Sequence, residues 1–462
     1  MTSVDTDTGF MTTTDADINQ LLSNIRWGQY SNYLSVPTDC PQRDERQGWT
    51  ADTQVFAKAG SYFAYSKSFL EKFMTDMRDA QNSEGAYPGT APTGAYAGAG
   101  WGGTGWADAG VIVPYTLYIH YGDTKVILEN WDSMQWYVDE YLARVGGPQN
   151  IWGDWLAYES NDATIQSMLS VAFYAWDGLM MAEMAKAIGK DADAERYLAL
   201  YEDQKQRFIE TYVTSTGRLR RTEQSVCLYA LYLNLLPDEK SYNTVLNQLT
   251  TNIKARGNKL GTGFLGTAII MQTLTKVGRS DLAYTLLLQH DNPSWFYSVD
   301  QGATTIWERW NSYTIESGFG DVGMNSFNHY AYGAVGGWMF ESMAGIGADP
   351  ENPGFKNVLL APQPDMRDTD TRLGCEATYD SPYGTIKASS QYEGDTWTYA
   401  FTLPANTTGT LTIPADSADI TINGKAVSAL TAEDGVTLLS STDSTTTFSV
   451  VCGSFTVVTN LK

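Results

Sequence analysis

The chain has 462 residues, a length that predicts two domains rather than one. Its 53 aspartates and glutamates outnumber 30 lysines and arginines, and the net charge of −23 argues against nucleic acid, whose phosphates bind basic surfaces. No apolar run approaches the length of a membrane span, and residues 1–17 are too polar for a signal peptide. We therefore expect a cytoplasmic protein without a membrane or nucleic-acid partner, or a secreted one if a leader was trimmed from it.

Helical periodicity dominates the larger, N-terminal part of the chain. Apolar residues recur every three or four positions in about twelve segments, most of them in consecutive pairs. The expected helices span about 14–34, 50–65 and 67–82, 106–121 and 123–145, 162–188 and 190–212, 222–235 and 238–255, 262–277 and 279–289, and 329–346. This pairing predicts a mainly α fold, an (α/α)6 toroid of six helical hairpins, with a helical repeat array as the alternative.

The C-terminal part has a different pattern. Residues 355–462 are rich in Thr, Val, Ser and Tyr, with alternating polar and apolar positions at 396–402 and 410–413. Asn423-Gly424 is a typical hairpin turn. We expect an antiparallel β-sandwich here, which divides the chain into a helical catalytic domain, 1–347, and a β-domain, 348–462.

The loops between the helical pairs hold the candidate chemistry. The loop over residues 37–52 contains four carboxylates, two arginines and Trp49, and Glu308 lies between Trp307 and Arg309. Glycosidic bond cleavage needs one carboxyl to protonate the leaving oxygen and another to attack or to activate water. Although a single loop carboxylate is more often a helix cap or a solvated charge, two acidic, tryptophan-rich loops that meet at one end of a ring predict a sugar-cleaving site.

The sequence predicts no metal or cofactor. Three histidines and four cysteines are present, but their spacing matches no metal or redox motif, and there is no phosphate loop or nucleophile elbow. We expect the cysteines to be buried free thiols, and Cys40 to be inert because no base stands next to it.

Several motifs together resemble one family. The run Asp39-Cys-Pro-Gln-Arg-Asp-Glu-Arg-Gln-Gly-Trp-Thr-Ala-Asp52 is similar to the signature of bacterial α-L-rhamnosidases, glycoside hydrolase family 78. Further family-like motifs follow in the same order: Trp106-Ala-Asp108-Ala-Gly, Gly153-Asp154-Trp155-Leu156, Gln301-Gly-Ala-Thr-Thr-Ile-Trp-Glu308-Arg-Trp310 and Asn325-Ser-Phe-Asn-His329-Tyr. The resemblance covers nearly the whole chain, and a fourteen-residue motif with four partners is far more specific than a lone short pattern.

The resemblance implies an inverting hydrolase of terminal α-L-rhamnose, with an (α/α)6 domain and a C-terminal β-domain. Glu45 would be the general acid and Glu308 the general base, with their carboxyls about 6.5–9.5 Å apart to leave room for one water. Substrate contacts would come from Asp39, Arg43, Trp49, Asp52, Trp106, Asp108, Trp155, Trp310 and His329. For Asp108 a supporting role is as well founded as a substrate contact.

One departure from the family and two alternative functions remain. Family members usually carry several β-sandwich domains before the helical domain, whereas the first motif here begins at Asp39. We therefore expect a fragment, a minimal enzyme, or a homodimer that covers the exposed face. The alternatives are a polysaccharide lyase, which would need a cation for a uronate and a Tyr or His base, and a carbohydrate-binding protein without catalysis.

Overall fold

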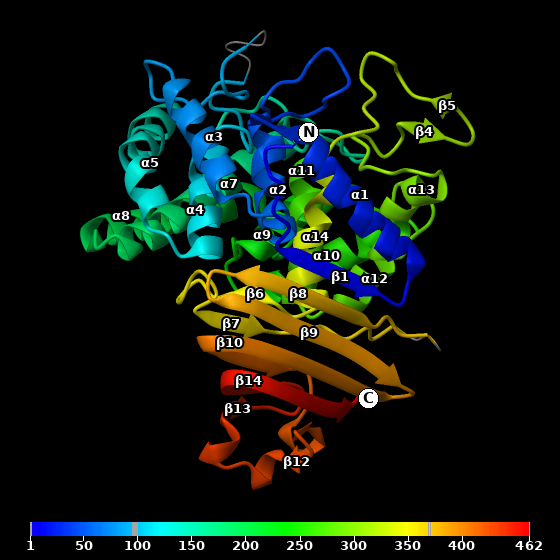
Figure 1. The fold of residues 1–462 in the computed structure, drawn as a ribbon. Coiled ribbons are helices and arrows are strands. Elements are labelled where there is room, and N and C mark those ends of the chain that lie inside the picture. Colours follow the sequence, from blue (N-terminus) through cyan, green and yellow to red (C-terminus); the bar gives the residue numbers. More distant parts are fainter. Residues whose placement is uncertain (1, 95–99, 368, 370, 462) are drawn as a thin grey trace.

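A computed structural model describes residues 2–94, 100–367, 369 and 371–461 (Figure 1). The helices form one body, and the strands of the C-terminal part form a sheet against one side of it. The expected fold class, mainly α with a C-terminal antiparallel sheet domain, is confirmed. Within the described ranges, no helix combines the length and the apolar composition that a bilayer crossing requires.

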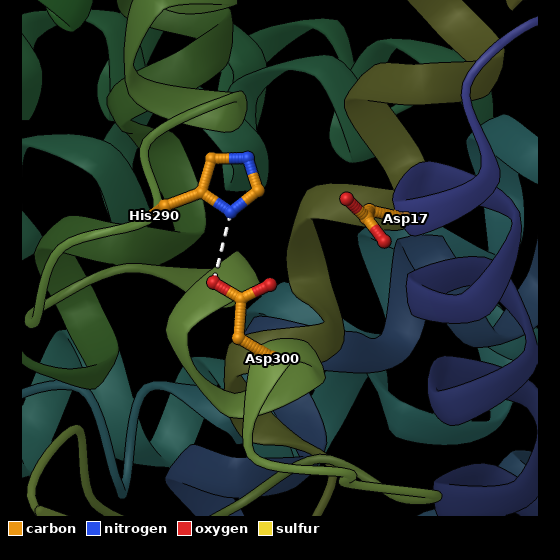
Figure 2. A group of neighbouring side chains, drawn as sticks. All are labelled: Asp17, His290 and Asp300. Carbon is orange, nitrogen blue, oxygen red and sulfur yellow. Dashed lines mark hydrogen bonds and ion pairs between the residues drawn. The ribbon is translucent and has the colours of Figure 1, made fainter. Parts of the chain in front are cut away.

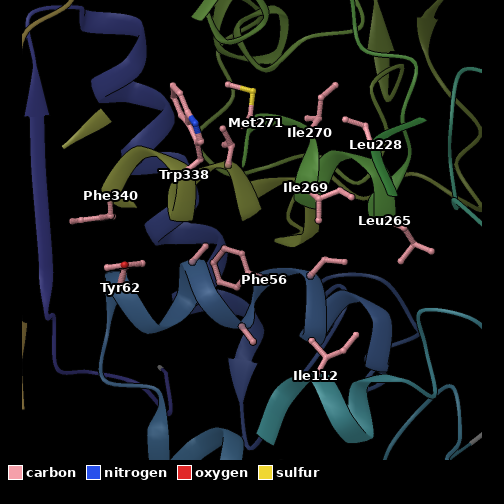
Figure 3. Close-up of a cluster of buried hydrophobic side chains, with 14 of the residues drawn as sticks. Phe56, Tyr62, Ile112, Leu228, Leu265, Ile269, Ile270, Met271, Trp338 and Phe340 are labelled. Atoms are coloured by element: carbon pink, nitrogen blue, oxygen red, sulfur yellow. The ribbon is translucent and has the colours of Figure 1, made fainter. Parts of the chain in front are cut away.

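Six inner helical segments contact one another in a closed ring. They are α2 (Thr50–Phe63), α4 (Ala109–Tyr121), α7 (Ala163–Ala187), α9 (Gln224–Tyr232), α11 (Phe264–Lys276) and α14 (Val335–Trp338), and α14 returns to pack on α2. Their apolar side chains meet in the middle, where Phe56 of α2, Ile112 of α4 and Ile269 of α11 lie close together (Figure 3). A closed ring excludes the helical repeat array, whose two ends do not meet.

The outer helices are amphipathic, as their position requires. They are α1 (Ala16–Asn32), α3 (Lys67–Asp79), α5 (Lys125–Gln135), α8 (Asp191–Tyr212), α10 (Glu239–Ala255) and α12 (Ser280–Leu287). In α8 only Tyr197, Tyr201 and Phe208 are buried, whereas in α9 every residue but the last is. The π-helical segment η1 (Trp136–Leu142) and α6 (Ala143–Val145) continue α5, so the predicted helix 123–145 is present but irregular.

The last predicted helix, 329–346, is broken into three short segments. A 3₁₀ turn, η2 (Ala331–Ala334), precedes α14, and a π-helical turn, η3 (Met339–Met343), follows it. Glycine favours this irregularity because it has low helix propensity, and Gly336 is required by packing, since a Cβ there would lie 2.5 Å from Cε2 of Phe63.

The stretch from 290 to 328 contains elements that periodicity missed. A short helix, α13 (Trp295–Asp300), is capped by Ser294, whose hydroxyl accepts a hydrogen bond from the N–H of Tyr297. The two-residue strands β4 (Tyr313–Thr314) and β5 (Gly318–Phe319) form a small hairpin. The long predicted loop at 82–105 includes residues 95–99, which lie outside the described part of the chain.

The strands are joined into one hydrogen-bonded sheet. Its described strands are β1 (Gly9–Thr13), β6 (Gly347–Ala348), β7 (Asn357–Leu360), β8 (Cys375–Ser381), β9 (Gly384–Glu393), β10 (Thr396–Ile413), β11 (Thr421–Ile422), β12 (Lys425–Ala426), β13 (Val436–Ser441) and β14 (Thr446–Asn460). The pairing is antiparallel except between β7 and β10. The predicted Asn423-Gly424 turn joins β11 to β12, with φ of 51° and 77°, as a type I′ turn requires.

The N-terminal strand corrects one expectation. Residues 9–13 were expected in the helical domain, but β1 pairs antiparallel with β8, from Gly9 opposite Tyr379 to Thr13 opposite Cys375. The strand has five residues, too few for its alternation to be distinguished from a polar tail. The division at 347/348 stays a prediction, while the sheet itself takes strands from both ends of the chain.

Replacing Gly336 with alanine should lower the free energy of unfolding by roughly 1–3 kcal/mol, because the new methyl group overpacks against Phe63. Gly337 is the matched control: its nearest neighbour would be Lys58 Cδ at 3.5 Å, so alanine there should be neutral or stabilising by up to about 1 kcal/mol. Urea unfolding followed by circular dichroism compares the variants. Equal midpoints for the two would contradict this packing account.

Candidate functional site

A cavity of about 370 Å³ lies among the loops at one end of the ring of inner helices. This is within the range of roughly 300–1,000 Å³ that small-molecule sites occupy. Its lining residues are Asp39, Arg43, Glu45, Trp49, Asp52, Trp106, Trp152, Trp155, Phe264, Glu308, Gly323, Met324 and His329. All the predicted site residues except Asp108 and Trp310 are therefore brought together, although they come from loops distant in the sequence.

Arg43 joins the two predicted catalytic carboxylates. Its Nη2 contacts Oε2 of Glu45, and its Nη1 lies 3.1 Å from Oε2 of Glu308. The same Nη1 donates a hydrogen bond of 2.6 Å to the carbonyl oxygen of Met324. Burial lowers the pKa of Arg43, but the neighbouring carboxylates outweigh it and raise that pKa, so the guanidinium stays charged.

Glu45 has both of its carboxylate oxygens engaged. While Oε2 faces Arg43, Oε1 accepts a hydrogen bond of 2.7 Å from the indole N–H of Trp49. The Trp49 ring lies edge-on to the Trp152 ring, with 5.2 Å between the ring centroids. The Trp152 ring packs on Trp106, with a centroid distance of 4.6 Å. The acid is thus held at the edge of an aromatic wall.

The loop that carries Glu45 is closed on itself by Asp39. The N–H of Asp39 donates to the carbonyl of Gln47, and the N–H of Gln47 donates to Asp39 Oδ1 at 2.9 Å. Arg46 adopts a left-handed φ of 52° within this turn. The following helix starts at Thr50, with Trp49 at the cap position.

Burial shifts the protonation of two carboxyls in the cavity. Burial and the negative charge of Glu45 together raise the pKa of Asp39 to about 7. The thiol of Cys40 donates a hydrogen bond of 2.8 Å to Asp39 Oδ2, and burial raises the pKa of that thiol. Burial also raises the pKa of Glu308, against the opposing effects of His329 and Arg43.

His329 and Asp52 form a buried pair on the cavity wall. Two backbone N–H groups, of Tyr330 and Ala331, donate to His329 Nδ1 at 2.9 and 3.2 Å, so that nitrogen carries no proton. The proton therefore lies on Nε2, which donates to Asp52 Oδ1 at 2.9 Å. Backbone pairing between His329 and Ile306 places this pair beside the segment that carries Glu308.

Asp108 and Trp310, both expected to contact substrate, lie outside the cavity lining. Buried Asp108 accepts hydrogen bonds from the N–H of Gly105 at 2.6 Å and from the hydroxyl of Tyr137 at 2.7 Å. The indole of Trp310 donates to the carbonyl of Thr262 at 3.1 Å and stacks on a neighbouring tyrosine ring. Because their polar atoms already have partners in the interior, these side chains support the loops instead.

Four lining residues were not among the predicted site residues: Trp152, Phe264, Gly323 and Met324. Trp152 immediately precedes the Gly153-Asp154-Trp155 motif, and this position could have predicted that it lines the cavity. Phe264 is the first residue of α11, and no sequence motif indicated that it would line the cavity. Asp154 places this region, because its carboxylate accepts hydrogen bonds from the N–H groups of Gly263 and Gly266 at the start of α11.

A second cluster of ionisable groups, drawn in Figure 2, is formed by residues that do not line the cavity. Asp17 of α1, His290 and Asp300 of α13 place one ligand-type atom each within 4.8 Å of one another. His290 Nδ1 lies 2.8 Å from Asp300 Oδ2, an interaction that a simple ion pair explains. All three side chains are at least partly exposed to solvent.

Models of two protein families match the chain. The model described as the bacterial alpha-L-rhamnosidase 6 hairpin glycosidase domain matches residues 6–343, and the bacterial alpha-L-rhamnosidase C-terminal domain matches residues 345–427. The chain belongs to the bacterial α-L-rhamnosidase family. The resemblance inferred from the motifs is thereby confirmed, as is the six-hairpin domain followed by a sheet domain.

Curated α-L-rhamnosidases are similar along most of this chain. The enzyme of Streptomyces avermitilis is 40% identical over 405 residues, which cover 87% of this chain and 38% of the relative. A relative in Formosa agariphila is 37% identical over 423 residues, covering 89% of this chain and 45% of the relative. The chain thus spans less than half the length of these family members.

Solved structures of the family share the fold. The structure of the Streptomyces avermitilis α-L-rhamnosidase complexed with L-rhamnose has a TM-score of 0.89 at 36% identity, covering 99% of this chain and 42% of that chain. The native α-L-rhamnosidase of Aspergillus terreus has a TM-score of 0.84 at 31% identity, covering 90% of this chain and 49% of that chain.

The raised pKa of Asp39 predicts a pH-dependent loss of stability. Between the unfolded pKa, near 4, and the folded value of about 7, the folded state holds a proton that the unfolded state releases, so stability falls as pH rises through this window. We expect wild type to lose on the order of 2 kcal/mol relative to Asp39→Asn from pH 4 to 7.5. Urea unfolding at several pH values measures the difference.

The matched control is Asp44→Asn, since the side chain of Asp44 is fully exposed on the same loop. Parallel pH profiles of stability for wild type and Asp39→Asn would refute the raised pKa of Asp39.

Proposed function

We propose that the chain hydrolyses terminal α-L-rhamnose from glycosides or oligosaccharides with inversion of configuration, Glu45 acting as general acid and Glu308 as general base. The observation that carries this proposal is the convergence of two carboxylates, linked by Arg43, in one tryptophan-walled cavity. Family membership supports the activity, and the relative solved with L-rhamnose supports the choice of sugar.

The chemistry needs a proton donor and a proton acceptor on opposite sides of the anomeric carbon. Glu45 gives its proton to the glycosidic oxygen as the bond from that oxygen to C1 breaks. A water attacks C1 from the other face, and its proton passes to Glu308. Solvent then returns Glu45 to its acid form and Glu308 to its carboxylate. Burial strengthens Glu308 as a base by raising its pKa.

The remaining wall suits a neutral deoxy sugar. The indole faces of Trp49, Trp106 and Trp155 offer apolar contact to a ring and its methyl group. Carboxylates accept stronger hydrogen bonds from hydroxyls than neutral groups do, and the carboxyl groups of Asp39 and Asp52 line the cavity. Arg43 is a positioning residue in this scheme, because it fixes the two glutamates relative to one another.

A polysaccharide lyase fits this cavity less well. Such an enzyme needs a cation free to neutralise a uronate carboxylate, whereas the guanidinium of Arg43 already contacts Glu45 and Glu308. An increase in ultraviolet absorbance from an unsaturated product would favour the lyase. Rhamnose binding without turnover would favour a carbohydrate-binding protein.

Substituting each glutamate by glutamine should separate the two roles. Glu45→Gln and Glu308→Gln should each slow hydrolysis of a rhamnoside with a poor leaving group by roughly 10²–10⁴-fold. A dinitrophenyl leaving group needs no proton, so it should restore activity to Glu45→Gln but not to Glu308→Gln. Steady-state rates on both substrates measure this, with Glu129→Gln on an outer helix as the control. Restoration in the Glu308 variant instead would reverse the assignment.

Inversion has a direct signature in the product. The first-formed rhamnose should have the anomeric configuration opposite to that of the substrate, because one displacement at C1 inverts it. Proton NMR within the first minutes, before the two anomers interconvert, reports the configuration. Initial release of the α-anomer would show retention and a covalent intermediate.

A further inference from the structure

An apolar hairpin stands next to the cavity. The strands β4 and β5 form this hairpin, and shortly after β5 the chain reaches Gly323 and Met324, which line the cavity. Three large apolar side chains in this segment are mostly exposed: Ile315 at 72%, Phe319 at 75% and Val322 at 91%. Large exposed apolar side chains gathered in one short segment are a candidate binding surface.

The hairpin is attached firmly to the site. Arg43 Nη1 donates to the carbonyl of Met324, and the side-chain amide of Gln42 donates to the hydroxyl of Ser326 at 2.8 Å. The base of the hairpin is closed by the side-chain amide of Asn325, which donates to the carbonyl of Ser312 at 2.9 Å. The exposed side chains therefore keep a fixed position relative to the two glutamates.

A line of aromatic rings leads from the reacting groups to the hairpin. Trp307 precedes Glu308 in the sequence and packs edge-on against Phe327, with 5.1 Å between the ring centroids. Phe327 packs against Phe319 with a centroid distance of 5.8 Å. Phe319 then packs on Tyr313 at 5.1 Å. Trp307 is buried while Phe319 is exposed, so the line ends on an uncovered ring.

We propose that Tyr313, Ile315, Phe319 and Val322 form a platform that binds the leaving group of the glycoside, and that this group is apolar and aromatic. The inference rests on the proposed function, which places the sugar in the cavity. The leaving group must then extend past the cavity wall, and Val322 directly precedes Gly323 of that wall in the sequence. The hairpin also lies at the end of the helical body away from the sheet, among the connecting loops (Figure 1).

The physical preference follows from the surface itself. Covering the Phe319 ring with an aromatic group removes apolar area from water on both partners, and edge-to-face or stacked rings add to this. The protein's charge of −23 disfavours an anionic leaving group. A methyl group in the same place would cover almost none of the platform.

Two thioglycosides that resist hydrolysis isolate this contact from catalysis. We expect wild type to bind phenyl 1-thio-α-L-rhamnoside roughly tenfold more tightly than the methyl compound in titration calorimetry. In Phe319→Ser/Val322→Ser the ratio should fall toward one, with the affinity for the methyl compound unchanged. Leu128→Ser, which removes a mostly exposed apolar side chain from the outer helix α5, should keep the wild-type ratio.

The outcomes are distinct. Equal affinities in wild type, or a preference that survives the double substitution, would overturn the platform and leave the proposed function intact. Failure of wild type to bind either compound would overturn both. Sedimentation velocity tests whether a second copy of the chain binds the hairpin instead. If wild type is a dimer and the double variant is a monomer, the hairpin is a contact between two copies, and the platform proposal is wrong.

Discussion

One guanidinium group organises the reactive end of this molecule. Glu45 and Glu308 are far apart in the sequence, but both side chains contact the same guanidinium, and neighbouring negative charges repel each other. Arg43 compensates both charges at once and also binds the Met324 carbonyl, so a single side chain ties the loop before α2 to the segment before η2. Without ring closure between α14 and α2 these two segments would not lie side by side, and Arg43 could not contact Glu45 and Glu308 at the same time.

The acidic residues of the helical domain divide into two kinds. Asp39, Glu45, Asp52 and Glu308 face the cavity. Asp108 and Asp154 are buried: Asp108 accepts hydrogen bonds from the N–H of Gly105 and the hydroxyl of Tyr137, and Asp154 accepts them from two backbone N–H groups, which fixes the loops that carry Trp106 and Trp155. A strongly acidic chain therefore uses carboxylates both to line the cavity and to anchor the backbone.

The helical ring was predictable from the sequence for physical reasons, whereas most of the cavity residues were named because the motifs resemble a known family. Periodic apolar spacing predicts amphipathic helices, paired helices predict a ring, and closure of a ring brings its loops together. The direction of a side chain within a loop has no such signal, so Asp108 and Trp310 were expected in the cavity although their partners are in the interior. The short strand β1 and the broken helix around Gly336 depend on contacts with distant segments, which local patterns do not record.

The pairing of β1 with β8 has a consequence for how the chain is made and handled. In the sequence, β1 lies before the helical ring and its partner β8 lies after it, so during synthesis the strand has an unpaired edge until the ring has been made. Truncation at the helix–sheet boundary would separate β1 from β8. The helical piece would keep β1 without its hydrogen-bonding partner, and the sheet would lose the strand at its edge. The two regions therefore form one inseparable unit for expression, and a gene trimmed between them should give material prone to aggregate.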